Sequence, residues 1–467
     1  MDGTRLDRRG FLAGAGAIAA GTVACGTGAG LEMAARTMGL TPDRPVPDAP
    51  LDRWDPSRFD PGDWSSVRES FLLSGDRIHL GSLYISSHPG PVREAIASHR
   101  LGLDRDPVGY FQRHDDRLTR DALVAAGRYM DADADDLALT DSTTMGLGLL
   151  YTGLRLRPGE EILTTEHDYY VTHESVRFAA ERSGASVRRI RLHGPDDLGR
   201  AGIGVDPDRL AEGIASAIRP STRVVALTWV HSGTGLKLPL ARIATAVRER
   251  TGDRPEEDRP ILCVDGVHGF GVEDEGMDDL GFDFFVAGCH KWLFGPRGTG
   301  LVWGRGQEAW QRVRPTIPSF LDSSSWSAWS RDEAPPGPTT AHRATPGGFK
   351  PFEHRWALGP AFDFHRAIGR ERVAGRTREL ARRLKEGLIE IPGVQLITPL
   401  SERVSSGIVC FEVDGRSPEE VVRGLAAHRV VATVTPYATR YVRLSPAMVN
   451  TPEEIDAAIA AVQDAAS

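Results

Sequence analysis

One stretch of the sequence decides how the rest is interpreted: AGCHKWLFGPRG, residues 287–298. It follows the apolar run 284–287, which predicts a buried strand. Lysine side chains usually lie on the solvated faces of a protein. Lys291, in contrast, stands just past this strand and is followed closely by Gly295 and Gly298. The position predicts that the Lys291 amine reaches into a cleft.

A carboxylate, that of Asp265, stands at the end of another strand-like run. Residues 260–264 are apolar, and Asp265 ends them, 26 residues before Lys291. An acid at such a position is often only a helix cap, so Asp265 alone would not indicate a site. Ligands of open α/β sheets bind at the carboxyl ends of the strands, where both residues are expected. We therefore interpret Asp265 and Lys291 as parts of one site.

Strand-like runs alternate with helical segments from about residue 120 onwards. This alternation is typical of an α/β domain with a mainly parallel sheet. The candidate strands are 136–140, 161–165, 223–228, 260–264 and 284–287.

The last third of the chain predicts a smaller domain of α+β type. Residues 322–348 are rich in Ser, Pro and Gly and predict a long loop between the domains, and 353–390 predict a long helical stretch. Ser417 and Thr451 each precede Pro-Glu-Glu, which predicts a capping box at the start of a helix. The candidate strands here are 394–398, 406–413, 430–434 and 441–444.

The composition excludes several classes of protein. The 467 residues include 56 basic and 64 acidic side chains, a formal net charge of −8, so the basic footprint of a nucleic-acid-binding protein is missing. The four cysteines lack the spacing of a disulfide scaffold or a zinc site, and we expect no metal. The 40% share of hydrophobic residues is ordinary for a soluble enzyme.

The N-terminus predicts an export signal. Arg8 and Arg9 precede a weakly apolar run, 11–24, which resembles a twin-arginine signal over residues 1–30. Residues 31–65 then predict a flexible tether. The expectation is export by the twin-arginine machinery to the periplasm or the exterior, with Cys25 as a candidate for lipid attachment. Without use of the signal the protein would be cytoplasmic.

The motifs around Asp265 and Lys291 resemble those of one enzyme family. Asp-x-x-His at 265–268 and Gly-x-His-Lys-x-x-x-Gly-Pro-x-Gly at 288–298 are similar to the class V aminotransferases of pyridoxal-phosphate (PLP) fold type I. The run Thr-Gly-Leu-Lys-Leu-Pro at 234–239 and the absence of a desulfurase cysteine resemble the isopenicillin N epimerase-like branch of this family. The resemblance covers residues 75 to about 460. It implies a homodimer whose fold is α/β, with a mainly parallel seven-stranded sheet in a large domain and a smaller α+β C-terminal domain.

The resemblance also implies domain boundaries. The large, PLP-binding domain would span residues 101–345 and the small domain 346–467. Residues 66–100 would form an N-terminal segment that packs with the small domain.

The family pattern assigns roles around pyridoxal 5′-phosphate. Lys291 matches the lysine that forms an imine with the cofactor aldehyde, and Asp265 matches the carboxylate that keeps a proton on the pyridine nitrogen. His268 matches the partner of the phenolic oxygen, and His290 matches a phosphate contact.

Further contacts follow from the same resemblance. Thr143 and Thr144 open a helix after a strand and match the phosphate loop. His167 matches the residue that stacks on the pyridine ring. Arg443 matches the arginine that binds the substrate carboxylate, which its planar fork suits. Arg440 is the competing interpretation, expected to be a surface residue.

Two features depart from the family. Relatives usually place an asparagine in the turn before Thr-Gly, where this chain has His231 and Ser232. Cysteine desulfurases also need a mobile cysteine before the C-terminal arginine, but no cysteine lies between Ala426 and Arg443. Cys410 lies in an apolar strand pattern, where a thiol is usually inert. Cysteine desulfurase activity is therefore disfavoured.

We predict a PLP-dependent enzyme that acts at Cα of an amino acid or related amine. Transamination ranks first, with epimerisation and lyase or oxygen-dependent chemistry as alternatives and a non-catalytic PLP-fold binding protein as a distant one. A dehydrogenase is excluded because no Gly-x-Gly-x-x-Gly opens a βαβ unit. A zinc hydrolase is disfavoured because His167 and His173 lack the spacing of a zinc-binding pair.

Overall fold

The computed structural model describes residues 54–194 and 205–467, which belong to one compact unit. The predicted signal at 1–30, with Arg8, Arg9 and Cys25, and most of the predicted tether lie outside the described residues. None of the described helices is long and apolar enough to cross a membrane.

A seven-stranded sheet forms the centre of the larger part of the fold, in the order β2-β8-β7-β6-β5-β3-β4. The pairs from β7 to β4 are parallel, whereas β8 runs antiparallel to both β2 and β7. The predicted mainly parallel sheet is therefore confirmed. Its strands are β2 (Leu137–Thr140), β3 (Glu161–Thr165), β4 (Ser186–Ile190), β5 (Thr222–Thr228), β6 (Ile261–Asp265), β7 (Phe284–Gly288) and β8 (Gly300–Gly304).

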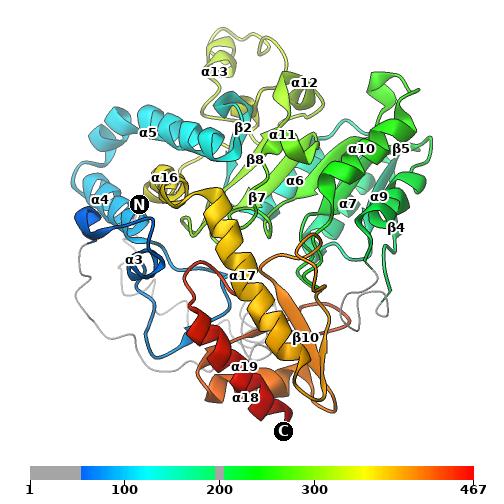
Figure 1. Cartoon of the computed structure of the whole chain (residues 1–467). Coiled ribbons are helices and arrows are strands. Elements are labelled where there is room, and N and C mark those ends of the chain that lie inside the picture. Colours follow the sequence, from blue (N-terminus) through cyan, green and yellow to red (C-terminus); the bar gives the residue numbers. More distant parts are fainter. Residues whose placement is uncertain (1–53, 195–204) are drawn as a thin grey trace, which may run out of the picture. The chain divides into compact units, whose positions relative to one another are not determined.

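Helices cover both faces of this sheet (Figure 1). In β6, Leu262 and Val264 pack with α5, α9 and α10, whereas Ile261 and Cys263 pack with α6 and α7. Strands buried on both faces become continuous apolar runs, which is why most of them could be predicted. These helices are α5 (Pro107–Met130), α6 (Thr143–Gly153), α7 (Tyr170–Ser183), α9 (Pro207–Ser216) and α10 (Leu240–Thr251).

Two strands of the sheet were not predicted. β4 is an edge strand that carries Arg188 and Arg189 and is partly solvated, so it lacks an apolar run. β8 begins and ends with a glycine, Gly300 and Gly304, which weakens the strand pattern although all five residues are buried.

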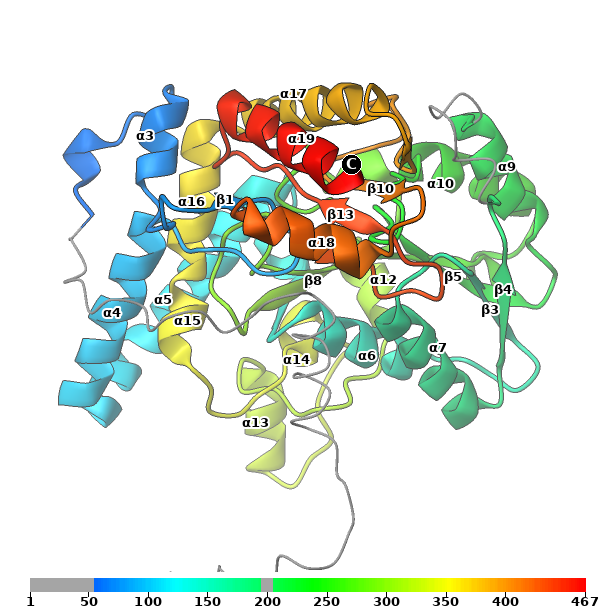
Figure 2. The ribbon, with the colours of Figure 1, turned by 90° about the horizontal axis from the view of Figure 1, so that it is seen from below.

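The C-terminal part has its own sheet and core. Its four strands are antiparallel in the order β12-β13-β10-β9, and α17, α18 and α19 cover them (Figure 2). Ser417 and Thr451 both form the predicted capping boxes. The elements are β9 (Val394–Leu396), β10 (Val409–Val413), β12 (Thr433–Val434), β13 (Val442–Leu444), α17 (Arg370–Ile389), α18 (Pro418–Ala427) and α19 (Pro452–Ala466).

The N-terminal segment contacts both parts of the fold. The end of the predicted tether is folded, because Phe59 stacks on Phe364 at 5.1 Å and α3 (Trp64–Glu69) begins at residue 64. β1 (Ile78–His79) pairs with β11 (Val430–Val431) of the C-terminal part. In contrast, α4 (Gly90–Arg105) packs against α5 and α15.

The connection between the two parts is also more helical than expected. Residues 322–348 contain α13 (Ser323–Trp329) and α14 (Ala341–Ala344). The stretch 353–390 is divided near Ala357 and at Gly369. Gly369 ends a helix with a φ of +96°, a backbone conformation that favours glycine. The first two pieces, α15 (Phe352–Trp356) and α16 (Leu358–Ile368), pack on α4 and α5, so residues 352–368 belong with the larger part.

Candidate active site

The loop after β7 presents Lys291 at the carboxyl end of the sheet. Phe294 adopts a left-handed φ of 54°, and the Gly295 N–H donates to the Cys289 carbonyl at 2.8 Å, which closes the loop tightly. Ser86 holds it from the N-terminal segment, because its hydroxyl donates to the Lys291 carbonyl at 2.7 Å. The Lys291 Nζ lies 3.3 Å from Nε2 of His268.

Lys291 differs from the other lysines in its partners. The chain has four lysines, and all lie in the described residues. Lys237 and Lys350 pair with Glu273 and Asp141, and Lys385 donates to two backbone carbonyls and a hydroxyl; the distances run from 2.8 to 3.0 Å. Lys291 has no carboxylate or carbonyl within hydrogen-bonding distance among those residues. It is therefore the lysine whose amine is available for chemistry.

Burial brings the pKa values of Lys291 and Asp265 towards neutrality. Burial lowers the pKa of Lys291 to about 8, against the opposing effect of the Asp265 charge. Burial raises the pKa of Asp265 to about 6, although the Val267 N–H, 3.2 Å from Oδ1, and the Lys291 charge favour its ionised form. A lysine with a lowered pKa is partly neutral near pH 7 and can act as a nucleophile or base.

Two neutral imidazoles flank the lysine. Burial holds the pKa of His268 far below its usual value, and the charges of Lys291 and Arg443 act in the same direction. His268 Nδ1 is buried and has no hydrogen-bond partner among the described residues. Burial also lowers the pKa of His290 to about 4. An unpaired buried ring nitrogen is costly, so His268 is suited to bind a ligand atom.

The N-terminus of α6 lies beside the lysine loop. Ser142 caps this helix, since its Oγ accepts from the Met145 N–H at 3.1 Å. Thr143 Oγ1 accepts from the Gly288 N–H at 2.8 Å and so joins the helix to the loop. Thr144 is exposed in the first turn, with no hydrogen bond from its side chain to another described residue. A helix N-terminus with free N–H groups suits a phosphate.

His167 lies in the turn after β3 and is held from several sides. Its Nε2 accepts from the Leu192 N–H at 3.2 Å, and its ring stacks on His193 at 3.7 Å. Burial lowers the pKa of His167 to about 3, so the ring is neutral. Asp168, which the sequence did not single out, fixes this turn by accepting from Thr165 and, on β5, from the Thr228 N–H, each at 2.7 Å. Its position after a strand end, like that of Asp265, could have indicated it.

Arg443 is a buried cation without a carboxylate partner in the described part of the chain. It is 4% exposed and lies on β13. Its Nε donates to Thr433 Oγ1 at 3.0 Å, and its Nη1 donates to the Ser232 carbonyl at 2.7 Å. Arg440, in contrast, forms a surface ion pair with Glu419 at 2.5 Å. Arg443 is therefore the arginine that can pair with an anionic ligand.

Comparison with known proteins identifies the family. The sequence model "Aminotransferase class-V" matches residues 126–458. The chain belongs to the class V aminotransferase family.

Relatives of this class V enzyme include epimerases and desulfurases. It is 28% identical to the isopenicillin N epimerase of Streptomyces clavuligerus over 409 aligned residues. The alignment covers 84% of this chain and 96% of the relative. A cysteine desulfurase of Salmonella agona (strain SL483) is 25% identical over 356 residues, or 72% of this chain and 79% of the relative.

Solved structures share the fold. A mutant of C-DES with glycine covalently linked to its PLP cofactor has a TM-score of 0.74 at 21% identity, over 85% of this chain and 99% of that one. The apo cysteine desulfurase from Thermococcus onnurineus NA1 has a TM-score of 0.72 at 19% identity, over 86% and 97% of the two chains. These likenesses show PLP fold type I.

The cofactor of this class V enzyme is pyridoxal 5′-phosphate, and the residues present fit it. Asp265 offers a buried carboxylate for the pyridine nitrogen, and the imidazole of His268, whose Nε2 faces Lys291, offers a partner for the phenolic oxygen. The N-terminus of α6 with Thr143, close to His290, can hold the phosphate. Lys291 would supply the amine that binds the aldehyde.

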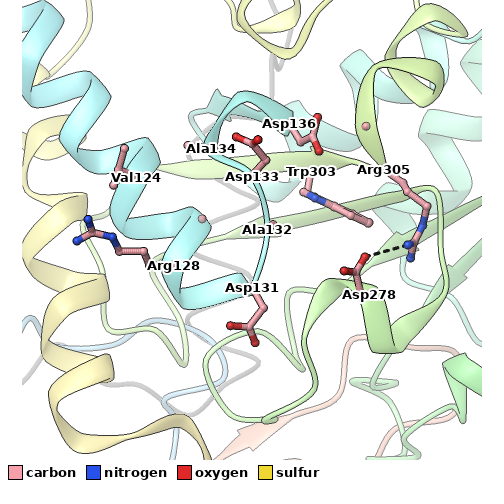
Figure 3. A pocket seen from close by; sticks show the side chains of 12 residues that line it. Val124, Arg128, Asp131, Ala132, Asp133, Ala134, Asp136, Asp278, Trp303 and Arg305 are labelled. Atoms are coloured by element: carbon pink, nitrogen blue, oxygen red, sulfur yellow. Dashed lines mark hydrogen bonds and ion pairs between the residues drawn. The ribbon is translucent and has the colours of Figure 1, made fainter.

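Other polar clusters of the fold do not suit this cofactor. A cavity of about 510 Å³ is lined by four aspartates, Asp131, Asp133, Asp136 and Asp278, and by only two arginines, Arg128 and Arg305 (Figure 3), so its net negative charge does not suit a phosphate. Glu273, Asp274 and Glu275 lie within 4.8 Å of one another, but Lys237 and Arg378 pair with them.

Proposed function

We propose that the enzyme transfers the amino group of an α-amino acid, with Lys291 moving the Cα proton and Arg443 binding the carboxylate. The observation that carries this proposal is the isolation of Lys291 from carboxylates and carbonyls of the described chain. Its pKa of about 8 leaves part of the amine neutral at physiological pH. PLP, when bound, withdraws electrons from Cα and so makes its proton acidic.

The residues around Lys291 would have separate roles in this reaction. The ionised Asp265 would keep a proton on the pyridine nitrogen. Arg443 would hold the carboxylate and so fix which Cα bond faces Lys291. The neutral imidazoles of His167 and His290 add no charge that would compete with Arg443. A single base suits transamination, in which the proton leaves Cα and is returned to the cofactor.

Epimerisation is the second candidate, and the relatives support it. The isopenicillin N epimerase from Streptomyces clavuligerus aligns with 84% of this chain. Epimerisation returns the proton to the opposite face of Cα, which requires a second donor. Tyr169 qualifies as that donor, because burial raises the pKa of its phenol and keeps it protonated.

Desulfurase chemistry has little support in the described residues. Cys263, Cys289 and Cys410 are all buried. Burial raises the pKa of Cys289 and of Cys410 to about 12, so neither forms the thiolate that a nucleophile needs.

Incubation of the holoenzyme with single enantiomers of amino acids in D2O, with and without a keto acid acceptor, distinguishes these reactions. Transamination predicts one equivalent of new keto acid per enzyme without the acceptor, and continued turnover only when the acceptor is present. Epimerisation predicts the opposite enantiomer, with deuterium at Cα, without an acceptor. If no amino acid exchanges its Cα proton for deuterium under either condition, the proposal is wrong.

A further inference from the structure

Two separate parts of the chain orient the Arg443 guanidinium. Thr433 accepts from Nε within the C-terminal sheet, and the Ser232 carbonyl, in the turn after β5, accepts from Nη1 at 2.7 Å. Nη2 has no hydrogen bond to any described residue. A guanidinium binds a carboxylate best through two parallel N–H groups, and the edge formed by Nη1 and Nη2 remains for this purpose. The position of the Ser232 carbonyl therefore sets the direction of that edge.

Tyr437 holds Ser232 in place. The Tyr437 hydroxyl lies 2.7 Å from Ser232 Oγ, and Ser232 is 4% exposed. The ring of Tyr437 covers the next residue, because a Cβ added to Gly233 would lie 3.0 Å from Cδ2 and Cε2 of the ring. The tyrosine thus contacts the turn through both its ring and its hydroxyl.

Other contacts of the same turn do not reach the arginine. Thr398 Oγ1 donates to the Thr234 carbonyl at 2.7 Å, and the Lys237 N–H donates to the Val404 carbonyl at 2.9 Å. These bonds hold residues further along the turn. Tyr437 is the described residue that hydrogen-bonds to the side chain of Ser232, whose carbonyl contacts Arg443.

We propose that Tyr437 is a positioning residue for substrate recognition: it fixes Ser232, whose carbonyl aligns Arg443 with the substrate carboxylate. This inference rests on the proposed function, in which Arg443 binds that carboxylate. Without the hydroxyl, the turn and the guanidinium would have to be ordered when substrate binds, which weakens binding. The chemical step at Lys291 would be unaffected.

The test uses holoenzyme variants that remove single hydroxyls. Tyr437→Phe and Ser232→Ala each delete one partner of the bond, and Tyr170→Phe removes a phenol hydroxyl from a side chain that is 68% exposed, as a matched control. Calorimetry measures Kd for propionate and for its neutral amide, and kinetics measure KM and kcat for an amino acid substrate. Arg443→Ala serves as the reference for complete loss of the carboxylate contact.

We expect Tyr437→Phe and Ser232→Ala each to raise the propionate Kd and the amino acid KM by about three- to tenfold, the range of one hydrogen bond. The amide Kd and kcat should stay constant, and Tyr170→Phe should change nothing. The double variant should be no weaker than either single variant, since both remove the same bond.

Two failures can be told apart. If Arg443→Ala leaves the propionate Kd unchanged, the proposed role of Arg443 is wrong and the inference falls with it. If Arg443→Ala weakens propionate binding but Tyr437→Phe and Ser232→Ala do not, the positioning role alone is wrong. A lower kcat at unchanged Kd in Tyr437→Phe would also overturn it, because the hydroxyl would then act on the reacting atoms.

Discussion

The role proposed for Lys291 rests on the lack of a carboxylate or carbonyl partner for its amine among the described residues. The other three lysines of the chain are engaged by carboxylates, carbonyls or a hydroxyl, whereas the Lys291 amine has only the His268 imidazole within hydrogen-bonding distance among the described residues. Borohydride reduction of the holoenzyme should therefore attach the cofactor to the peptide that contains Lys291. Peptide mass spectrometry should find no label in Lys291→Ala, and an unchanged label in Lys237→Arg, which keeps the charge that pairs with Glu273. A label on any other lysine of the wild type contradicts the assignment.

The ionised carboxylate of Asp265 should lower the free energy of unfolding of the apoprotein near neutral pH. An ordinary aspartate ionises near 3.8, but burial raises the pKa of folded Asp265 to about 6. Because the folded pKa is the higher one, stability is greatest below the unfolded pKa and falls as pH rises towards 6. Relative to Asp265→Asn, wild-type apoprotein should lose up to about 3 kcal/mol of unfolding free energy between pH 4 and 6.

Denaturant titrations of both apoproteins across this pH range measure the effect. Asp253→Asn, at an exposed position, is the control and should follow the wild type. Asp265→Asn holoenzyme should retain the fold but lose most of its turnover, because a neutral amide does not favour the protonated pyridine. A pH-independent difference in stability, or near-normal turnover, would contradict the assignment.

At the scale of single elements, a helix cap offers a test that is separate from the active site. Ser417 Oγ accepts from the Glu420 N–H at 3.3 Å at the start of α18, and Glu420 bonds back to the Ser417 N–H at 2.8 Å. Ser417→Ala should lower the free energy of unfolding by about 1 kcal/mol, the usual value of such a cap. KM should not change. Chemical denaturation measures the loss, and an unchanged midpoint would show that the cap is not formed.

The same elements show what the sequence could and could not predict. The capping boxes, the strand that ends at Asp265 and the strand that ends at Gly288, just before Lys291, depend on residues a few positions apart, so local pattern was sufficient. The contact of Ser232 with Tyr437 joins residues 205 positions apart, and no local pattern marks it. β4 was missed because it is a partly solvated edge, and Phe59 was assigned to a tether because its stacking partner, Phe364, is remote in sequence.

At the scale of the whole molecule, we predict a homodimer. The segment before α15 carries two pairs of exposed aromatic side chains: Phe320 and Phe349 are 67% and 83% exposed, and Trp326 and Trp329 are 68% and 70% exposed. Phe320 and Phe349 lie 6.3 Å apart, and both line one cavity. Apolar patches of this kind are rarely left in water and mark interaction surfaces. Beside them, Lys350 pairs at 2.9 Å with Asp141, which directly precedes the cap of α6.

The pair of Lys350 and Asp141 connects the aromatic surface to the N-terminus of α6, where the phosphate is expected. A substitution that prevents dimerisation should therefore also weaken the binding of PLP. Phe349→Asp places a charge on the patch and should yield a monomer that releases PLP more readily. Phe178→Asp, at a 46% exposed position on α7, is the control and should remain dimeric. Light scattering gives the mass, and absorbance after gel filtration gives the bound PLP. A fully active wild-type monomer at assay concentration would refute the prediction, because the aromatic surface would then have no partner copy to cover it.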